Sequence, residues 1–248
     1  MCVLAILYQS AHDSPILVVS NREEYYDRPS QPPRIQAGKP RVICGIDRKA
    51  GGTWFGVNQY GLFATVLNRP KTNIPPEPRS RGLLCRELLN PRTAKEAAEL
   101  ALRELKTGKY AGANFIVADG KTASVIYGAD KISCVPLAPG LHIFSGATID
   151  DYNDPRQQFI RRLLTLHKLD SAVTFLAVAS RSFSREPDSA GRRGVVIKGT
   201  DYGTVSSTLL SLPDRTQNAV YQYAPGPPCD HAYDDLSALL RQVLSAEK

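Results

Sequence analysis

The residue of this chain with the clearest chemical potential is Cys2, which follows the initiator methionine and opens an apolar run, residues 2–8. Removal of Met1 would leave Cys2 with both a thiol and a free α-amine. The thiol ordinarily has a pKa of about 8.5 and the amine one of roughly 8, so a single residue would hold nucleophile and base without a histidine. Cysteine is equally a good small apolar side chain for a buried strand, and both interpretations stay open at this point.

A polar block, Asn21-Arg22-Glu23, ends the second apolar run and is the first candidate neighbour of the thiol. If the first two apolar runs pair as a β-hairpin, the chain returns at Asn21 to the edge from which Cys2 starts. Asn21, Arg22 and Glu23 would then lie beside the thiol. The alternative is an ordinary strand end held by salt bridges and an Asx turn.

A second candidate segment starts with Gly51-Gly52-Thr53-Trp54 and continues into a hairpin expected at residues 53–67, which Asn68 follows. Adjacent glycines permit a close approach of backbone, and an asparagine at the end of an apolar strand can direct its amide at a developing oxyanion. A tight bulge and a strand-terminating asparagine explain the same residues without chemistry. Trp54 is most simply an aromatic of the core or of a pocket wall.

The elements that must position these residues are short strands and amphipathic helices. The chain is expected to leave the strand at residues 21–30 and to form a loop at Pro29, Pro32 and Pro33. Strands at both ends with helices between them predict an α+β layered fold rather than an alternating doubly wound one, in a single domain, residues 1–248. The expected strands are 2–9, 15–20, 113–118, 124–127, 132–136, 141–144, 195–198, 204–212 and 219–223, and the expected helices are 82–89, 93–105, 155–167, 171–179 and 234–246.

Composition narrows the class of protein. Of the 248 residues, 42% are hydrophobic and 22% are charged, which is typical of a folded globular chain. The net charge is +7, but the basic residues are scattered among acids and form pairs only at Arg161-Arg162 and Arg192-Arg193. This pattern indicates a solvated surface; nucleic-acid binding would require a continuous basic face. No apolar run reaches the length of a transmembrane helix and no basic segment precedes the first run, so the expected location is the cytosol.

The cysteines and histidines predict no metal or disulfide framework. The five cysteines are widely spaced and form no CxxC pair, and the four histidines show no metal-ligand spacing. We therefore expect reduced thiols and no cofactor. The cysteines are Cys2, Cys44, Cys85, Cys134 and Cys229.

Five ordered motifs carry a family resemblance that spans nearly the whole chain. They are the opening Met-Cys, the block Asn21-Arg22-Glu23-Glu24 with Asp27-Arg28-Pro29, the stretch Gly51-Gly52-Thr53-Trp54, the pair Asn68-Arg69, and Asp201-Tyr202-Gly203-Thr204. Together they resemble the NRDE family, which includes the eukaryotic transport and Golgi organisation 2 proteins. That family is similar to the N-terminal-nucleophile hydrolases of the cholylglycine hydrolase and penicillin V acylase group. The resemblance implies a four-layer αββα sandwich.

The same resemblance implies roles for individual residues. Cys2 would be the nucleophile, Glu23 would orient its amine or thiol, and Asn68 would stabilise the tetrahedral intermediate, with Asn21 and Arg22 beside them. Trp54, Gly146 and Thr204 would contact the substrate. The implied reaction is hydrolysis of a linear non-peptide amide through an acyl-enzyme, and the partner is a small amide or hydrophobic molecule rather than a nucleic acid.

Three departures from the family pattern bear on activity. Glu23 stands where the family has its namesake aspartate, Gly146 stands where the related hydrolases place a second asparagine, and Val205 stands where many relatives have an arginine. The cation expected near the site would then come from another residue, and Arg22 is one candidate. Loss of polar groups of this kind lowers turnover. The alternative function is therefore a non-catalytic binding or trafficking protein that holds a lipid-like or haem-like ligand in the same pocket.

Overall fold

The computed structural model describes residues 2–187 and 194–246. Met1, whose removal matters to the chemistry, and the basic pair Arg192-Arg193 lie outside the described residues. The chain divides into two units, each built from separated segments: the first comprises Met1–Asp27 and Pro139–Ser237, and the second Arg28–Ala138 and Ala238–Lys248.

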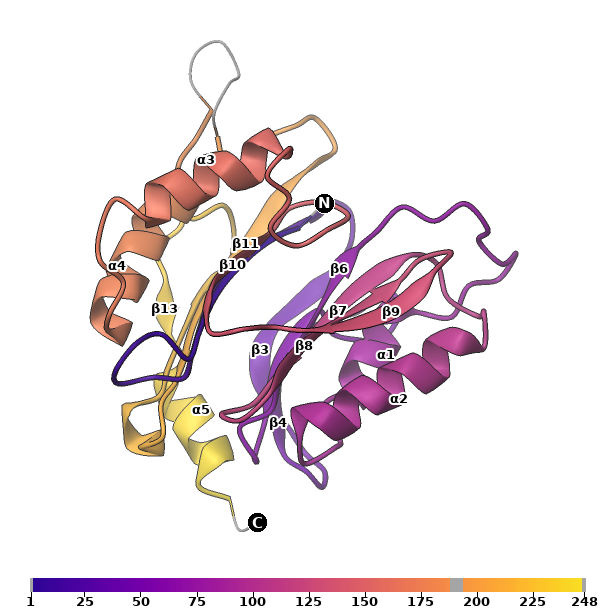
Figure 1. Ribbon diagram of the computed structural model, residues 1–248, viewed down its shortest axis with the longest axis horizontal. Coiled ribbons are helices and arrows are strands. Elements are labelled where there is room, and N and C mark those ends of the chain that lie inside the picture. Colours follow the sequence, from indigo (N-terminus) through magenta and orange to yellow (C-terminus); the bar gives the residue numbers. More distant parts are fainter. Residues whose placement is uncertain (1, 188–193, 247–248) are drawn as a thin grey trace. The chain divides into compact units, whose positions relative to one another are not determined.

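The first unit is a six-stranded antiparallel sheet in the order β10-β1-β2-β11-β12-β13, with the helices α3 and α4 on one of its faces (Figure 1). A short 3-10 turn, η1 (Thr216–Asn218), connects two of the strands. The bounds are β1 (Val3–Tyr8), β2 (Ile16–Tyr25), β10 (Gly140–Phe144), β11 (Tyr202–Leu212), β12 (Val220–Ala224), β13 (Asp234–Asp235), α3 (Pro155–Leu164) and α4 (Ala172–Phe183).

Alternate residues of β1 and β2 build the core of this unit. Successive side chains of a strand point to opposite faces, so Val3, Leu17 and Val19 share the face on which Ile160 of α3 and Phe175 of α4 pack. Asn21 and Glu23 continue the same alternation along β2. Their side chains are thereby directed to the helical layer.

The hairpin expected from the first two apolar runs is confirmed, because β1 pairs with β2 and Val3 lies opposite Asn21. The expectation that the chain leaves the strand at residue 21 is wrong, since β2 continues to Tyr25. The reason is long-range pairing: Tyr202 of β11 lies opposite Tyr25, and Thr204 lies opposite Glu23. The strand expected at 195–198 is also wrong, because this segment makes only an isolated bridge between Lys198 and Gly203.

The second unit is a seven-stranded antiparallel sheet, ordered β3-β4-β5-β6-β7-β8-β9, that packs against α1 and α2. Thr93 caps α2 as the sequence predicts, and alanines dominate the buried face of that helix. The last helix, α5, starts where the chain passes into this unit. The bounds are β3 (Ser30–Gln36), β4 (Val42–Asp47), β5 (Phe55–Asn58), β6 (Phe63–Asn68), β7 (Ala113–Ala118), β8 (Ala123–Gly128), β9 (Ile132–Pro136), α1 (Arg81–Glu87), α2 (Ala94–Lys106) and α5 (Ser237–Leu244).

The proline-rich segment that the sequence predicts as a loop contains a strand. Pro32 and Pro33 lie in β3, which is an edge strand, and the pairing register with β4 shifts between Gln31 and Arg34. Proline donates no backbone hydrogen bond, and an edge strand with a register shift is where that loss is tolerated. None of the helices in the described part of the chain has the length and apolar character needed to cross a membrane.

Candidate functional site

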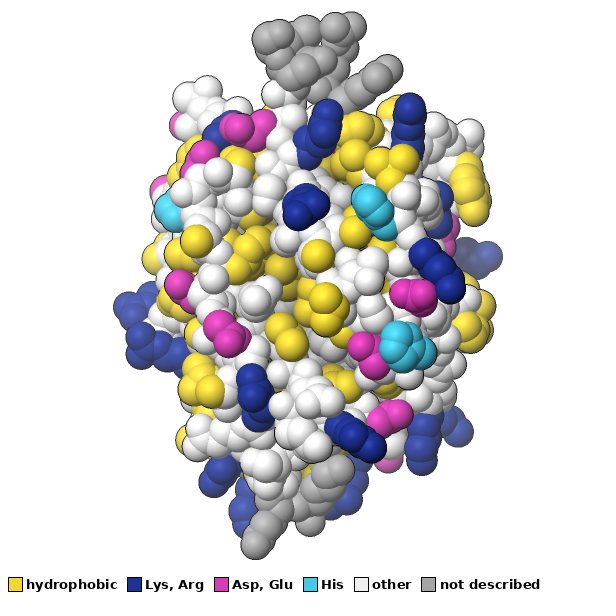
Figure 2. Space-filling view, turned by 90° about the vertical axis from the view of Figure 1, so that its left-hand side faces the viewer, with side chains coloured by type: hydrophobic (Ala, Val, Ile, Leu, Met, Phe, Trp, Pro, Cys, Tyr) yellow, Lys and Arg dark blue, Asp and Glu magenta, His cyan; other side chains and the backbone are white. Residues whose placement is uncertain are grey.

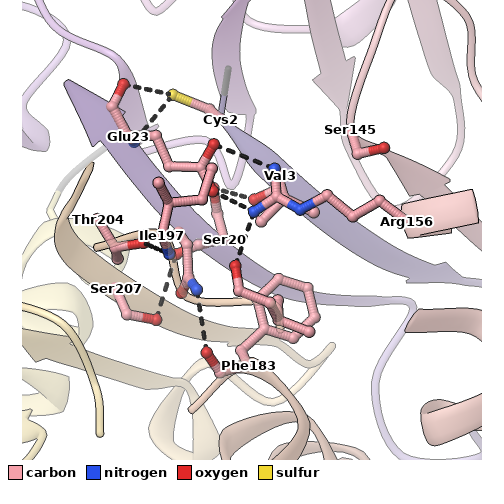
Figure 3. A network of polar contacts seen from close by, with 12 residues as sticks. Cys2, Val3, Ser20, Glu23, Ser145, Arg156, Phe183, Ile197, Thr204 and Ser207 are labelled. Atoms are coloured by element: carbon pink, nitrogen blue, oxygen red, sulfur yellow. Dashed lines mark hydrogen bonds and ion pairs between the residues drawn. The ribbon is translucent and has the colours of Figure 1, made fainter. Parts of the chain in front are cut away.

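The thiol of Cys2 lies against the backbone of Glu23 (Figure 3). Val3, the first residue of β1, pairs with Asn21, so Cys2 lies one residue before β1. Beyond Asn21, β2 continues without a paired strand on the β1 side. The Sγ atom accepts a hydrogen bond from the Glu23 N–H at 3.4 Å and donates to the Glu23 carbonyl oxygen at 3.7 Å. The hairpin thus brings the thiol to the polar block, as the geometry of two paired strands predicts.

Burial raises the pKa of the Cys2 thiol, and the Glu23 carboxylate raises it further. The hydrogen bond from the Glu23 backbone and the positive charge of Arg22 act in the opposite direction and are weaker. The thiol is therefore protonated at neutral pH. Nucleophilic attack by Cys2 requires a base that takes this proton.

Arg156 supplies the positive charge that faces Glu23. The Glu23 side chain is 0% exposed and Arg156 is 21% exposed, and both terminal guanidinium nitrogens bind the carboxylate, one of them to Oε2 at 3.1 Å. The second nitrogen also donates to the Val195 carbonyl oxygen at 2.7 Å. A bidentate arginine is the strongest common partner for a buried carboxylate, so this contact accounts for a charge in the interior of the unit.

The first turn of α3 positions Arg156. Asp154 caps this helix by accepting hydrogen bonds from the backbone N–H groups of Arg156 and Gln157, and Pro155 occupies the first helical position. Arg156 is a site residue that the sequence motifs do not predict. The available signal was the Asp-Pro helix start, which places residue 156 in the first turn, together with the strand alternation that directs Glu23 to the helical layer.

Asn21 and Arg22 are the neighbours of Glu23 along the chain that the sequence also nominates for the site. Asn21 is fully buried and its Nδ2 donates to the carbonyl oxygen of Phe183, the last residue of α4, at 3.0 Å. Its Oδ1 has no hydrogen-bond partner among the described residues. Arg22 lies 3.9 Å from the carboxylate of Glu24. The cation that binds the Glu23 carboxylate through two nitrogens is Arg156.

The motif at residues 201–204 reaches the same place from β11. The Tyr202 hydroxyl donates to the Glu23 carbonyl oxygen at 3.0 Å, and burial is the main factor that raises the pKa of Tyr202. Thr204, which the resemblance places at the substrate, is fully buried, and its hydroxyl oxygen accepts a hydrogen bond from the Ile197 N–H at 3.0 Å. Val205 lies at the register shift between Thr204 and Ser206.

Gly146 follows β10 near the start of α3. The hydroxyl of its neighbour Ser145 binds the Asp154 carboxylate. A β-carbon added at Gly146 would come no closer than 3.4 Å to its nearest neighbour, that same carboxylate. This is an ordinary contact distance, so crowding does not require a glycine here.

Asn68 and Trp54 belong to the second unit, and their participation at Cys2 stays a prediction. Asn68 is the last residue of β6 and lies opposite Ala113. The Trp54 ring covers Gly45, where an added β-carbon would lie 2.5 Å from the indole. Gly52 touches the start of α1, because an added β-carbon would lie 2.1 Å from the carbonyl carbon of Gly82. The glycine-rich motif therefore has a structural function within its own unit.

A group with metal-ligand geometry lies elsewhere in the first unit. Donor atoms of Glu186, Cys229 and Asp230 lie within 4.8 Å of one another. The Lys198 ammonium binds the Glu186 carboxylate at 2.6 Å and the Asp230 carboxylate at 2.9 Å. Lys198 thus already neutralises the two carboxylates that would bind a metal ion.

The surface charge bears on the nucleic-acid alternative. On the face drawn in Figure 2, the central Lys and Arg side chains lie singly among acidic and apolar side chains, and several adjoin one another only at the edges of the view. This face is not the continuous basic surface that nucleic-acid binding requires.

Comparison with protein families gives one match that covers most of the chain. Residues 1–222 match the model of the family described as "Transport and Golgi organisation 2". The "Transport and Golgi organization protein 2 homolog" of Bos taurus is 27% identical over 243 residues, which span 85% of this chain and 88% of the relative. The alignment with the Mus musculus homolog is 27% identical over 164 residues and spans 58% of that protein, less than two thirds of its length.

Solved structures with a similar fold are amide hydrolases of low sequence identity. The Caenorhabditis elegans N-acylethanolamine-hydrolyzing acid amidase ortholog has a TM-score of 0.55 at 15% identity and covers 86% of this chain and 94% of its own. Penicillin V acylase from Agrobacterium tumefaciens has a TM-score of 0.50 at 13% identity, with 97% of this chain and 88% of its own covered. The chain therefore has the α+β fold of the N-terminal-nucleophile hydrolases, an αββα sandwich, as the sequence predicts.

Proposed function

The chain belongs to the transport and Golgi organisation 2 family, and from that premise we propose that it is an N-terminal-cysteine amidohydrolase that acts on a linear non-peptide amide. The observation that carries the proposal is the contact between the Cys2 thiol and the backbone of Glu23, whose buried carboxylate is held by Arg156. A thiol at the start of a strand, next to an ion pair in the interior, is the arrangement expected of a positioned nucleophile rather than of a packing residue.

The first step of the proposed reaction is activation of the thiol. The Glu23 carboxylate is engaged by Arg156 and raises the pKa of Cys2, so it is poorly suited to remove the thiol proton. The α-amine that Cys2 would gain on removal of Met1 lies within the same residue. This amine takes the proton, and the thiolate attacks the carbonyl carbon of the substrate.

The second step releases the amine part of the substrate. A tetrahedral intermediate forms with its negative charge on the former carbonyl oxygen, which Asn68 and a backbone N–H would stabilise. The protonated α-amine returns its proton to the leaving nitrogen, the carbon–nitrogen bond breaks, and a thioester remains on Cys2. Water then hydrolyses the thioester and frees the thiol. The fold neighbours, which include an N-acylethanolamine-hydrolyzing amidase and an acylase, support an amide as substrate class.

A second candidate function is binding of a lipid-like or haem-like ligand at the same site without turnover. Val205 and Gly146 favour it, because the first stands where many family relatives have an arginine and the second where the related hydrolases have an asparagine, and neither supplies a polar side chain. A protonated thiol also suits a passive site. The names of the curated relatives refer to transport and Golgi organisation rather than to a reaction.

Intact-protein mass spectrometry tests the proposal. The purified chain is treated with a thiol-directed acylating probe, with Cys2→Ala as the matched variant, and the modified peptide is mapped because Cys134 is exposed and will react on its own. We expect a chain that lacks Met1 and a Cys2-dependent acyl adduct that forms and then hydrolyses. Retention of Met1, or an adduct pattern unchanged by Cys2→Ala, would contradict hydrolysis. Ligand retention that survives Cys2→Ala would favour the binding function.

A further inference from the structure

We propose that Tyr202 is a catalytic residue of the Cys2 site, and that its hydroxyl donates a further side-chain hydrogen bond to the oxyanion that forms when a substrate carbonyl is attacked. This inference rests on the proposed function and names a group that the family motif does not assign to chemistry. It places an oxyanion donor in the same unit as the nucleophile.

The thiol and the phenol share one acceptor. Cys2 Sγ donates to the Glu23 carbonyl oxygen at 3.7 Å, and the Tyr202 hydroxyl donates to the same oxygen at 3.0 Å. The Glu23 N–H and C=O both face Cys2, whereas Tyr202 belongs to β11 on the other side of β2. The tyrosine therefore reaches across β2 to place its hydroxyl on the side of the thiol.

Attack by the thiol on a substrate creates a new acceptor for the Tyr202 hydroxyl. When Sγ loses its proton and bonds to the substrate carbon, it stops donating to the Glu23 carbonyl, and the new oxyanion forms next to Sγ. A rotation of the phenol hydroxyl then directs its proton from a neutral carbonyl to a charged oxygen, which is the stronger acceptor. Burial and the nearby negative groups keep Tyr202 protonated, so that it acts as a donor throughout.

Two other side-chain donors of the first-unit site bind acceptors away from the thiol. The Asn21 amide nitrogen donates to the Phe183 carbonyl, and the Ser145 hydroxyl binds the Asp154 carboxylate. Neither of these acceptors is a partner of the thiol. The Tyr202 hydroxyl, by contrast, donates to the Glu23 carbonyl oxygen, to which Cys2 Sγ also donates.

Neighbouring side chains pack against the Tyr202 ring and hold it in place, whereas the O–H bond of its hydroxyl can rotate. The Tyr25 ring meets the Tyr202 ring edge to face, with 5.3 Å between centroids and 74° between planes. The next residue, Gly203, is close to Tyr26, where an added β-carbon would lie 2.2 Å from the Tyr26 hydroxyl. Removal of the Tyr202 hydroxyl alone should therefore preserve the packing.

Two electrophiles separate oxyanion stabilisation from thiol positioning. p-Nitrophenyl acetate acylates a thiol through a tetrahedral oxyanion, whereas iodoacetamide alkylates it at a saturated carbon without one. Cys2-dependent p-nitrophenolate release and Cys2 alkylation are measured for the wild type, Tyr202→Phe, Tyr25→Phe and Cys2→Ala. We expect Tyr202→Phe to slow acylation on the order of 10²-fold, the usual effect of removing one oxyanion donor, and to leave alkylation within about twofold of the wild type. Tyr25→Phe, which keeps the aromatic contact, should alter neither rate.

The outcomes are distinct. Equal acylation rates for wild type and Tyr202→Phe would overturn the role of Tyr202 while leaving the Cys2 reaction in place. An equal loss in acylation and alkylation would also overturn it, because the hydroxyl would then only position the thiol. If the wild type shows no Cys2-dependent acylation although iodoacetamide modifies Cys2, the proposed function fails and the oxyanion role fails with it.

Discussion

Replacement of Arg156 by glutamine is the most direct test of the ion pair at the centre of the site. The variant removes the cation and leaves the Glu23 carboxylate inside the first unit, where that side chain is 0% exposed. Glutamine can keep a neutral hydrogen bond to the carboxylate and one to the Val195 carbonyl, but not the charge. We expect the folded state to lose stability because the cost of desolvating Glu23 is no longer compensated.

The magnitude follows from how deeply each partner is buried. Breaking a buried ion pair by removal of one partner costs about 3–5 kcal/mol. Arg156 is 21% exposed and water screens it in part, so we expect about 3 kcal/mol. In a chain of this length that loss lowers the melting temperature by roughly 6–12 °C.

Urea unfolding followed by circular dichroism measures the effect, with Arg161→Gln as the matched control. Arg161 lies on the same helix and pairs with Asp150, but these side chains are 26% and 24% exposed, so this variant should cost about 1 kcal/mol or less. The double variant Glu23→Gln, Arg156→Gln should recover part of the loss, because no unpaired charge remains. The reasoning is refuted if Arg156→Gln costs no more than Arg161→Gln, or if the double variant is as unstable as the sum of the single ones.

Three further outcomes follow from other residues. The rate of Cys2 alkylation by iodoacetamide should still increase with pH at pH values above those at which an ordinary thiol is fully ionised, because the pKa of the Cys2 thiol is raised. Glu23→Gln should shift this pH–rate profile to lower pH, because the carboxylate contributes to the raised pKa. An unshifted profile would contradict this. Burial raises the pKa of Cys44 to about 11, so the folded state holds that proton more tightly than the unfolded chain. Its contribution to stability is present below pH ~9 and lost towards pH ~11, roughly 2–3 kcal/mol in alkaline urea titrations, and Cys44→Ala should flatten this fall. Gly52→Ala should lower the urea midpoint strongly, because its β-carbon meets the backbone at the start of α1, whereas Gly146→Ala should leave the midpoint nearly unchanged; similar midpoints would refute the contact.

The parts of the fold that follow local rules could be predicted from the sequence. The first hairpin follows from two apolar runs separated by a polar turn, and Thr93 at the start of α2 follows from helix capping. The end of β2 could not be predicted in this way. Its last residues are polar and would leave a strand on their own preferences, but pairing with β11, whose Tyr202 lies opposite Tyr25, keeps them extended.

The candidate site shows the same division. The position of Cys2 beside the polar block depends on a single hairpin, and the sequence suffices to infer it. Arg156 is 133 residues from Glu23 in the chain, and no local pattern joins them. The motifs in the sequence instead point to Arg22 and to position 205 as places for the cation. The structure instead uses a helix whose start was predicted correctly but whose first turn had no assigned function.

Because of the ion pair between Glu23 and Arg156, hydrolysis and ligand binding place different requirements on the N-terminus. A carboxylate beside a thiol opposes formation of the thiolate, and Arg156 occupies that carboxylate through two guanidinium nitrogens. Glu23 is then unsuited to act as the base, so hydrolysis depends on an amine that Cys2 gains only when Met1 is removed. Ligand binding has no such requirement, because a protonated thiol in a polar site can hold a ligand whether or not Met1 is present. A chain that retains Met1 and still binds its ligand would therefore be a binding protein, and a processed chain whose Cys2 forms a transient thioester would be a hydrolase.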